Sequence, residues 1–316
     1  GGFDRSSGID VTGLGTGTIK VTGEATLTTA SGVKPTLPNS IVLNSDATLH
    51  LKARSTDSTI TLAGGITGAG DLTIDTRDDT AIVLAGDVNI GGEITIHSDS
   101  GTFKSSLQVG DGGITGSLLA ARIYADRYGA LVYDHKSGHT AELDFAYEGN
   151  GHFLKNGAGE LKLKQPLQHS NLGNTYINNG TLTLTADNLL SRQSDLIING
   201  NGTLNLNGYN QTAVSIEDGG NSFRDGVPDN GGGHIDTGAG GVLKLLAGSG
   251  TFSGVISGLG GLTKDGTGRL TLTGANTYTG PTQVLAGYLR FGDDSSGTIV
   301  DSLSDQTSVY IADGAQ

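Results

Sequence analysis

Short alternating segments dominate this chain and limit what it can fold into. An aliphatic residue occupies every second position in pieces such as SDATLHLKA, TITLAGG, GDLTID, GEITIH, GTLNLNG and GVLKLL. This period-2 alternation over about four to six residues predicts β-strands with one apolar face. Strands this short are unstable alone, and they recur about every ten residues, so they need neighbours stacked above and below to bury that face.

The residues between these segments predict how the chain turns. The sequence holds 54 Gly against 5 Pro, and Gly or Asn ends most of the segments, where positive φ allows a sharp corner. Short strands joined by such corners predict an all-β fold, a parallel β-helix (solenoid) that forms a single elongated rod. With roughly 20 to 25 residues per coil, we expect about 13 to 15 coils and a length of about 60 to 70 Å.

A long internal repeat supports a stacked architecture. Residues 151–185, GHFLKNGAGELKLKQPLQHSNLGNTYINNGTLTLT, align with residues 260–292, so that Phe153 matches Leu262 and Lys155 matches Lys264. The sequels also match, which makes the full unit roughly 110 residues. We therefore divide the single β-helical chain, 1–316, into divergent coils (1–106), a first repeat unit (107–218), a loop insertion (219–234) and a second repeat unit (235–316).

Two other structural readings are weaker. An antiparallel sandwich would show tight hairpin turns between paired strands and no self-similarity over such a long unit. Residues 117–135, SLLAARIYADRYGALVYDH, form the one stretch that could be helical, with Gly129 as its C-terminal stop. The β-branched and aromatic tail of this stretch favours strands.

Composition excludes several functions. Lys and Arg number 19 and Asp and Glu number 32, a net charge of −13 without a basic cluster, so we expect no nucleic acid as partner. The chain has no Cys, which excludes disulfides, thiol nucleophiles and thiolate-ligated metals. No G-K dipeptide and no paired histidine spacing occur, so we expect no cofactor and no metal site. No apolar run is long enough to span a membrane as a helix.

Catalytic patterns are sparse. Neither G-x-S-x-G nor G-D-S-G occurs. Glu142 and Asp144, in the segment AELDF, alternate with apolar residues and so share a solvent-facing side, as carboxylate pairs do in β-helical enzymes that degrade polysaccharides. A glycoside hydrolase or lyase is therefore the alternative function. Threonine rows also suggest an ice-binding solenoid, but Lys162, Lys164, Asn205 and Arg290 interrupt them.

One family resemblance accounts for these features together. GLGGLTKDGTGRLTLTGANTYTGPTQVLAGYLRFG, residues 258–292, resembles the autotransporter-associated β-strand repeat in passenger domains of type V secreted proteins of Gram-negative bacteria. Residues 107–163 resemble another copy, and the resemblance covers chiefly 107–218 and 241–316. It implies a right-handed parallel β-helix, exported across the outer membrane to the cell surface. Many such passengers act in adhesion, aggregation or biofilm growth, and the sparse catalytic patterns of this sequence lead us to expect a passenger that is not an enzyme.

The resemblance also implies partners and candidate contact residues. The membrane-embedded C-terminal β-barrel of the family is absent from this sequence, so we expect a passenger alone, linked to a membrane only through that barrel. We expect it to bind a host surface or matrix component, or a passenger on a neighbouring cell. The residues chosen for contact are the densest aromatic and charged patch and the centre of the loop at 217–234: Arg122, Tyr124, Asp126, Arg127, Tyr128, Tyr133, Phe223, Arg224 and Asp225.

Overall fold

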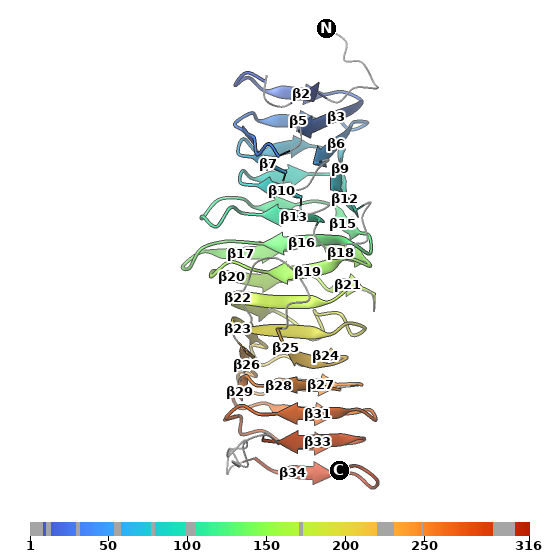
Figure 1. Cartoon of the computed structure of the whole chain (residues 1–316), viewed down its shortest axis with the longest axis vertical. Coiled ribbons are helices and arrows are strands. Elements are labelled where there is room, and N and C mark those ends of the chain that lie inside the picture. Colours follow the sequence, from blue (N-terminus) through green and yellow to red (C-terminus); the bar gives the residue numbers. More distant parts are fainter. Residues whose placement is uncertain are drawn as a thin grey trace.

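A computed structural model shows an elongated stack of strands (Figure 1). It describes residues 9–10, 14–29, 32–53, 58–76, 80–98, 105–170, 173–219, 231–247, 249–292 and 307–316. The strands follow one another from the N-terminus at one end of the rod to the C-terminus at the other. The described residues form no helix, and their parallel sheets stack as a β-solenoid, which confirms the predicted fold class.

Three sheets run along the N-terminal part of the rod, and two of them are long. The eight-stranded sheet contains β1 (Ile9–Asp10), β3 (Glu24–Thr29), β6 (Thr48–Ala53), β9 (Asp71–Thr76), β12 (Glu93–Ser98), β15 (Arg122–Ala125), β18 (Ala146–Gly149) and β21 (Leu167–His169). The third sheet contains β2 (Ile19–Val21), β5 (Ile41–Leu43), β8 (Ile66–Gly68), β11 (Val88–Ile90) and β14 (Leu118–Leu119).

The thirteen-stranded sheet is the longest and continues into the C-terminal part. Its path contains β4 (Thr36–Leu37), β7 (Thr59–Leu62), β10 (Ala81–Leu84), β13 (Ser105–Val109), β16 (Gly129–Tyr133), β19 (His152–Lys155), β22 (Thr175–Leu184), β23 (Leu196–Asn205), β26 (His234–Asp236) and β29 (Val255–Ser257). Beside this path lie β17 (Thr140–Leu143), β20 (Glu160–Leu163) and β25 (Ile216–Asp218).

Two smaller sheets complete the C-terminal coils. One contains β24 (Gln211–Ala213), β27 (Val242–Leu245), β30 (Gly261–Lys264), β32 (Thr282–Val284) and β34 (Val309–Ile311). The other contains β28 (Gly250–Phe252), β31 (Arg269–Leu272) and β33 (Tyr288–Phe291). The segment considered for a helix, 117–135, instead forms β14, β15 and β16, which confirms the strand reading.

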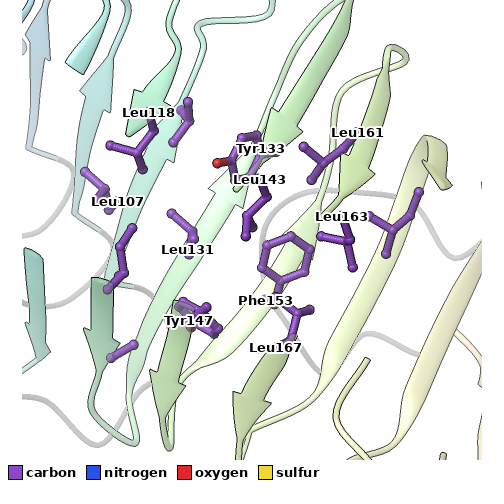
Figure 2. Packing of buried hydrophobic residues seen from close by; sticks show 14 of the residues in the cluster. Leu107, Leu118, Leu131, Tyr133, Leu143, Tyr147, Phe153, Leu161, Leu163 and Leu167 are labelled. Atoms are coloured by element: carbon purple, nitrogen blue, oxygen red, sulfur yellow. The ribbon is translucent and has the colours of Figure 1, made fainter. Parts of the chain in front are cut away.

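Alternation along each strand builds the core. In β9 the side chains of Leu72, Ile74 and Thr76 are buried while those between them are more exposed. Parallel register then stacks buried positions of successive coils, so that Leu72 pairs with Ile94 and Ile94 with Ile123. Figure 2 shows the next layers, where Tyr147, Phe153 and Leu163 gather in the interior. The result is one continuous apolar column along the rod.

The number of coils differs from the expectation. The solenoid has about 11 turns rather than 13 to 15. Several turns are longer than the roughly 20 to 25 residues expected for one coil. This is seen in the register, where Glu93 pairs with Arg122 of the next turn and Thr203 pairs with His234. Loops between strands lengthen a turn without adding a layer, so a fixed residue count per coil overestimates the number of coils.

The strands on either side of the expected insertion, 219–234, pair with the same neighbouring strand. β22 and β23 are continuous strands, whereas β25 and β26 divide the next strand between them. Gly232 donates its N–H to the Ser253 hydroxyl (2.8 Å), and the Ser253 N–H donates to the Asp218 carboxylate (2.7 Å). These bonds join the described residues on the two sides of 220–230, which lie outside the described ranges. His234, the last residue of the expected insertion, already belongs to β26.

Candidate binding surface

The outer face of the eight-stranded sheet carries polar side chains in straight columns. The central column runs through Thr26, His50, Thr73, Thr95, Tyr124, Glu148 and Gln168. These residues point outward because their neighbours in sequence point into the core. Since successive coils are about 4.8 Å apart, the columns form a flat polar surface along the rod. We call this surface the ladder face.

Ion pairs link neighbouring coils at one edge of the ladder face. Arg122 lies between Glu93, at 2.9 Å from its nearest carboxylate oxygen, and Glu148, at 3.6 Å. The hydrogen bond and charge of Glu93 raise the pKa of Arg122 above its ordinary value. At the other edge, Lys52 pairs with Asp75 at 2.7 Å. Arg122 is half exposed and the Lys52 pair is partly exposed, so solvent screening keeps the contribution of these pairs to stability small.

Four of the residues chosen from the sequence gather at one place on this face. Tyr124, 38% exposed, stands in the central column, and the guanidinium of Arg127 lies 5.4 Å from the ring centre of Tyr128. Asp126 accepts hydrogen bonds from the N–H groups of Ser98, Tyr128 and Gly129. The same carboxylate also contacts the ring of His97, whose Nδ1 lies 2.5 Å from it. Asp126 therefore holds the turn between β15 and β16.

Other chosen residues lie elsewhere. Tyr133 is only 1% exposed and packs beside Phe153 in the core, so it cannot contact a partner of the folded rod (Figure 2). In β16, Leu131 and Tyr133 point into the core, whereas Val132 between them points to the other face of the sheet. Phe223, Arg224 and Asp225 lie outside the described residues.

The carboxylates of the alternative enzyme reading are engaged by the neighbouring coil. Glu142 accepts a hydrogen bond from Lys164 at 2.5 Å, and Asp144 accepts one from the Gln165 amide at 3.2 Å. The bond to Glu142 raises the pKa of Lys164. Both carboxylates therefore have the geometry of surface pairs between coils. Within the described ranges, no cluster of three or more His, Asp or Glu side chains could hold a metal ion.

A second feature was not anticipated from the sequence. Ala130, Val132, Leu154, Tyr176 and Ile197 form a buried apolar cluster separate from the core. They belong to β16, β19, β22 and β23 and alternate with core residues, which places them on the outer face of the thirteen-stranded sheet. The sequence carries part of this signal, because GALVY is apolar at consecutive positions instead of alternating.

Buried histidines accompany this cluster. The ring of His152 lies 5.7 Å from that of Tyr176, and its Nδ1 accepts the backbone N–H of Asn174 at 3.0 Å. In the core, His169 Nε2 lies 3.1 Å from the Thr175 hydroxyl. Burial lowers the pKa of both imidazoles to about 4. Both are therefore neutral at physiological pH and act as structural hydrogen-bonding groups.

Comparison with known proteins adds one family match. Residues 262–291 match the passenger-associated-transport-repeat model. No curated protein and no solved structure matches the chain. The part of the chain that the structure describes has no helix with the length and apolarity needed to cross a bilayer. The family of this repeat is usually non-enzymatic and implies export to the cell surface. A parallel β-solenoid that carries a passenger-associated transport repeat fits an autotransporter passenger domain with repeats.

Proposed function

We propose that this protein is a surface-displayed, non-enzymatic passenger that mediates bacterial adhesion, cell-to-cell aggregation or both, and so promotes biofilm formation. Its partner is a host surface or matrix component, or the same protein on a neighbouring cell. The observation that carries the proposal is the ladder face, where Thr95, Tyr124 and Glu148 of successive coils stand in one column. A flat, regular face of this kind suits contact with another extended surface.

The mechanism is the sum of many weak contacts. Threonine hydroxyls, carboxylates and Tyr124 offer hydrogen bonds at a regular spacing, and each is individually worth about 1 kcal/mol or less. Because many copies are tethered to one cell, effective concentration multiplies these contacts without requiring any single tight site. The net charge of −13 opposes self-association at low salt, so aggregation should strengthen as ionic strength rises to physiological values.

The test uses two double variants in the same pair of coils. The double variant Thr73→Lys with Thr95→Lys replaces two neighbouring threonines of the central column with long charged side chains, which would block close contact with the ladder face. Asp71 and Asp75 lie on either side of Thr73 on the same face of β9. The control, Thr67→Lys with Asn89→Lys, makes the same charge change on the sheet that contains β8 and β11. Each version is displayed on bacteria, and settling and attachment to host cells and matrix are measured.

We expect the ladder-face variant to lose most settling or attachment, and the control variant to retain both. Equal behaviour of the two variants would contradict a role for this face, and a wild type that neither settles nor attaches would contradict the proposed function. The alternative enzyme predicts release of reducing or unsaturated sugars that disappears in Glu142→Gln and Asp144→Asn. We expect no such turnover on bacterial or plant polysaccharides.

A further inference from the structure

Two buried lysines occupy equivalent positions in the two aligned repeats, residues 151–185 and 260–292. Lys155 ends β19 and is 1% exposed, and Lys264 ends β30 and is 0% exposed. A lysine that is fully buried is rare, because removing its ammonium from water is costly unless hydrogen bonds replace the lost solvation. Finding one at equivalent positions in both halves indicates a shared structural requirement.

Each ammonium group donates to two backbone carbonyls at one corner. Lys155 Nζ donates to the carbonyl oxygen of Gly157, in its own coil, and to that of Asn179, in the next coil, at 3.0 Å. Lys264 Nζ donates in the same way to Gly266 at 2.6 Å and to Ala286 at 3.5 Å. Each lysine therefore ties the corner of one coil to the corner of the next.

In the next coil, a glycine follows the carbonyl that accepts from each lysine, Asn179 in one copy and Ala286 in the other. Gly180 and Gly287 have φ values of +69° and +72°. A Cβ at Gly180 would lie 2.3 Å from the Gly159 carbonyl oxygen, and one at Gly287 would lie 2.4 Å from that of Gly266. The corner is thus built from a lysine and a closely packed glycine in both halves.

The approach to the corner also matches. Thr175 and Thr282, five residues before these glycines, are both buried. The Thr175 hydroxyl lies 3.1 Å from His169 Nε2, and the Thr282 hydroxyl lies 2.6 Å from the Tyr278 hydroxyl. The partner side chain differs, but the buried hydroxyl contact is retained. The two copies are therefore equivalent at this threonine as well as at the lysine and the glycine.

We propose that residues 153–184 form a second passenger-associated transport repeat, and that Lys155 and Lys264 are clamps that set the register of the following strand in each copy. A slip by one residue would turn every side chain of that strand to the wrong face. The strands concerned are the second half of β22, which pairs Thr181 with Glu160, and β33, which pairs Tyr288 with Arg269. The clamp fixes the residue at which each of these strands begins.

The charge of the clamp is costly, which favours a role in specificity over one in stability. Burial lowers the pKa of both lysines, that of Lys155 to about 8, with the Asp134 carboxylate partly opposing this shift. An apolar side chain of similar volume would avoid this cost but would leave the corner carbonyls without their donor. Retention of lysine in both copies is therefore explained by its two directed bonds.

Hydrogen exchange of the whole chain tests the proposal. Lys155→Met and Lys264→Met each keep most of the alkyl chain but remove the donor, and Lys244→Met removes a surface lysine that pairs with Asp265 at 2.7 Å. We expect Lys155→Met to speed exchange at least tenfold at residues 179–184 without changing 286–291. Lys264→Met should do the reverse, and Lys244→Met should change neither segment.

A second pair of variants separates hydrogen bonding from packing. Lys155→Gln and Lys264→Gln restore a donor and should recover part of the lost protection in their own copy. Gln variants no better protected than Met variants, a response in one copy only, or a change spread evenly along the rod would each overturn the proposal. These measurements need no binding partner, so their outcome is independent of the adhesion assays.

Discussion

The side-chain amide of Asn199 donates to the side-chain oxygen of Asn178 in the preceding coil, at 2.5 Å. Asn178 in turn donates to Asn156 at 2.8 Å, which makes a three-coil asparagine ladder at one corner of the rod. The next position in register is Gly219, where a Cβ would lie 1.4 Å from Asn199 Oδ1. The ladder therefore ends at Asn199, because a side chain does not fit at the next position.

Removing the middle of this ladder should destabilise the rod. Asn178→Ala removes the acceptor of Asn199 and the donor to Asn156, and Asn178 is 2% exposed. Buried groups left without partners cost about 1 to 3 kcal/mol, which should appear as a lower midpoint in urea unfolding. Asn89→Ala, on the exposed side of β11, should change the midpoint little. Equal midpoints for the two variants would show that the ladder contributes nothing.

Two buried tyrosines should respond differently to loss of the hydroxyl. Tyr147 donates to the His152 carbonyl oxygen at 2.7 Å, whereas the Tyr133 hydroxyl has no hydrogen-bond partner among the described residues. Tyr147→Phe should cost about 1 to 2 kcal/mol, and Tyr133→Phe should be neutral or stabilising. Thermal unfolding of the two variants, which carry the same chemical change at almost equal burial, measures this difference directly. The reverse order would contradict the assigned hydrogen bonding.

A glycine at a corner can be needed because its φ is positive, because a Cβ would collide with a neighbouring atom, or for both reasons. Gly180→Ala places a methyl group against the Gly159 carbonyl oxygen at positive φ, whereas Gly138, with φ +81°, has open space around it. Gly138→Ala should therefore cost about 1 kcal/mol from backbone strain alone, and Gly180→Ala several-fold more. Denaturant unfolding checks the comparison. If both variants lost the same stability, close packing at Gly180 would not be the reason for glycine there.

Acid should weaken the fold through its buried histidines. Burial lowers the pKa of His152 and His169 from 6.5 to about 4, so between these values the unfolded chain binds more protons than the folded one. The unfolding free energy should then fall as the pH drops from 6.5 to 4, by up to about 3 kcal/mol per histidine. Protonation of His152 would also turn its Nδ1 acceptor, which serves the Asn174 N–H, into a donor.

This pH dependence is measured by denaturant unfolding across the acid range. The variant His152→Gln should show a shallower dependence of stability on pH between 6.5 and 4 than the wild type, because the proton linked to His152 is removed. An unchanged slope would show that His152 is not neutral and buried in the folded rod.

The surface carboxylate pairs should contribute little to stability. Glu142→Gln weakens a solvent-exposed pair with Lys164 and should leave the midpoint of urea unfolding nearly unchanged. Salt screens exposed charges, so the small difference in midpoint between the wild type and Glu142→Gln should shrink further as salt rises to physiological values. A large fall in the midpoint would assign Glu142 a buried role that its exposure does not support.

Much of the fold followed from local pattern. Alternation in DLTID and GEITIH indicated which side chains face inward, and β9 and β12 bury those same positions. Parallel stacking was also predictable, because short recurring strands can bury one face by stacking and the long internal repeat argues against an antiparallel sandwich. The first inference depends on adjacent residues, and the second on a repeat within the same chain.

The candidate surface was predicted only in part. Tyr124 and Arg122 stand on the ladder face, but Tyr133, chosen for the same aromatic patch, lies in the core. The outer cluster around Tyr176 and Leu154 was missed, because consecutive apolar residues do not say which of them faces out.

The sequence by itself determined the type of element, the inward and outward positions of the regular strands, and the equivalence of the two halves. Only the tertiary structure decided the number of coils, the pairing of Glu93 with Arg122, and the clamps made by Lys155 and Lys264. The physical reason is that alternation is a property of adjacent residues, whereas register joins residues one whole turn apart. The length of each turn depends on loops and corners whose conformation is settled only when the coils pack.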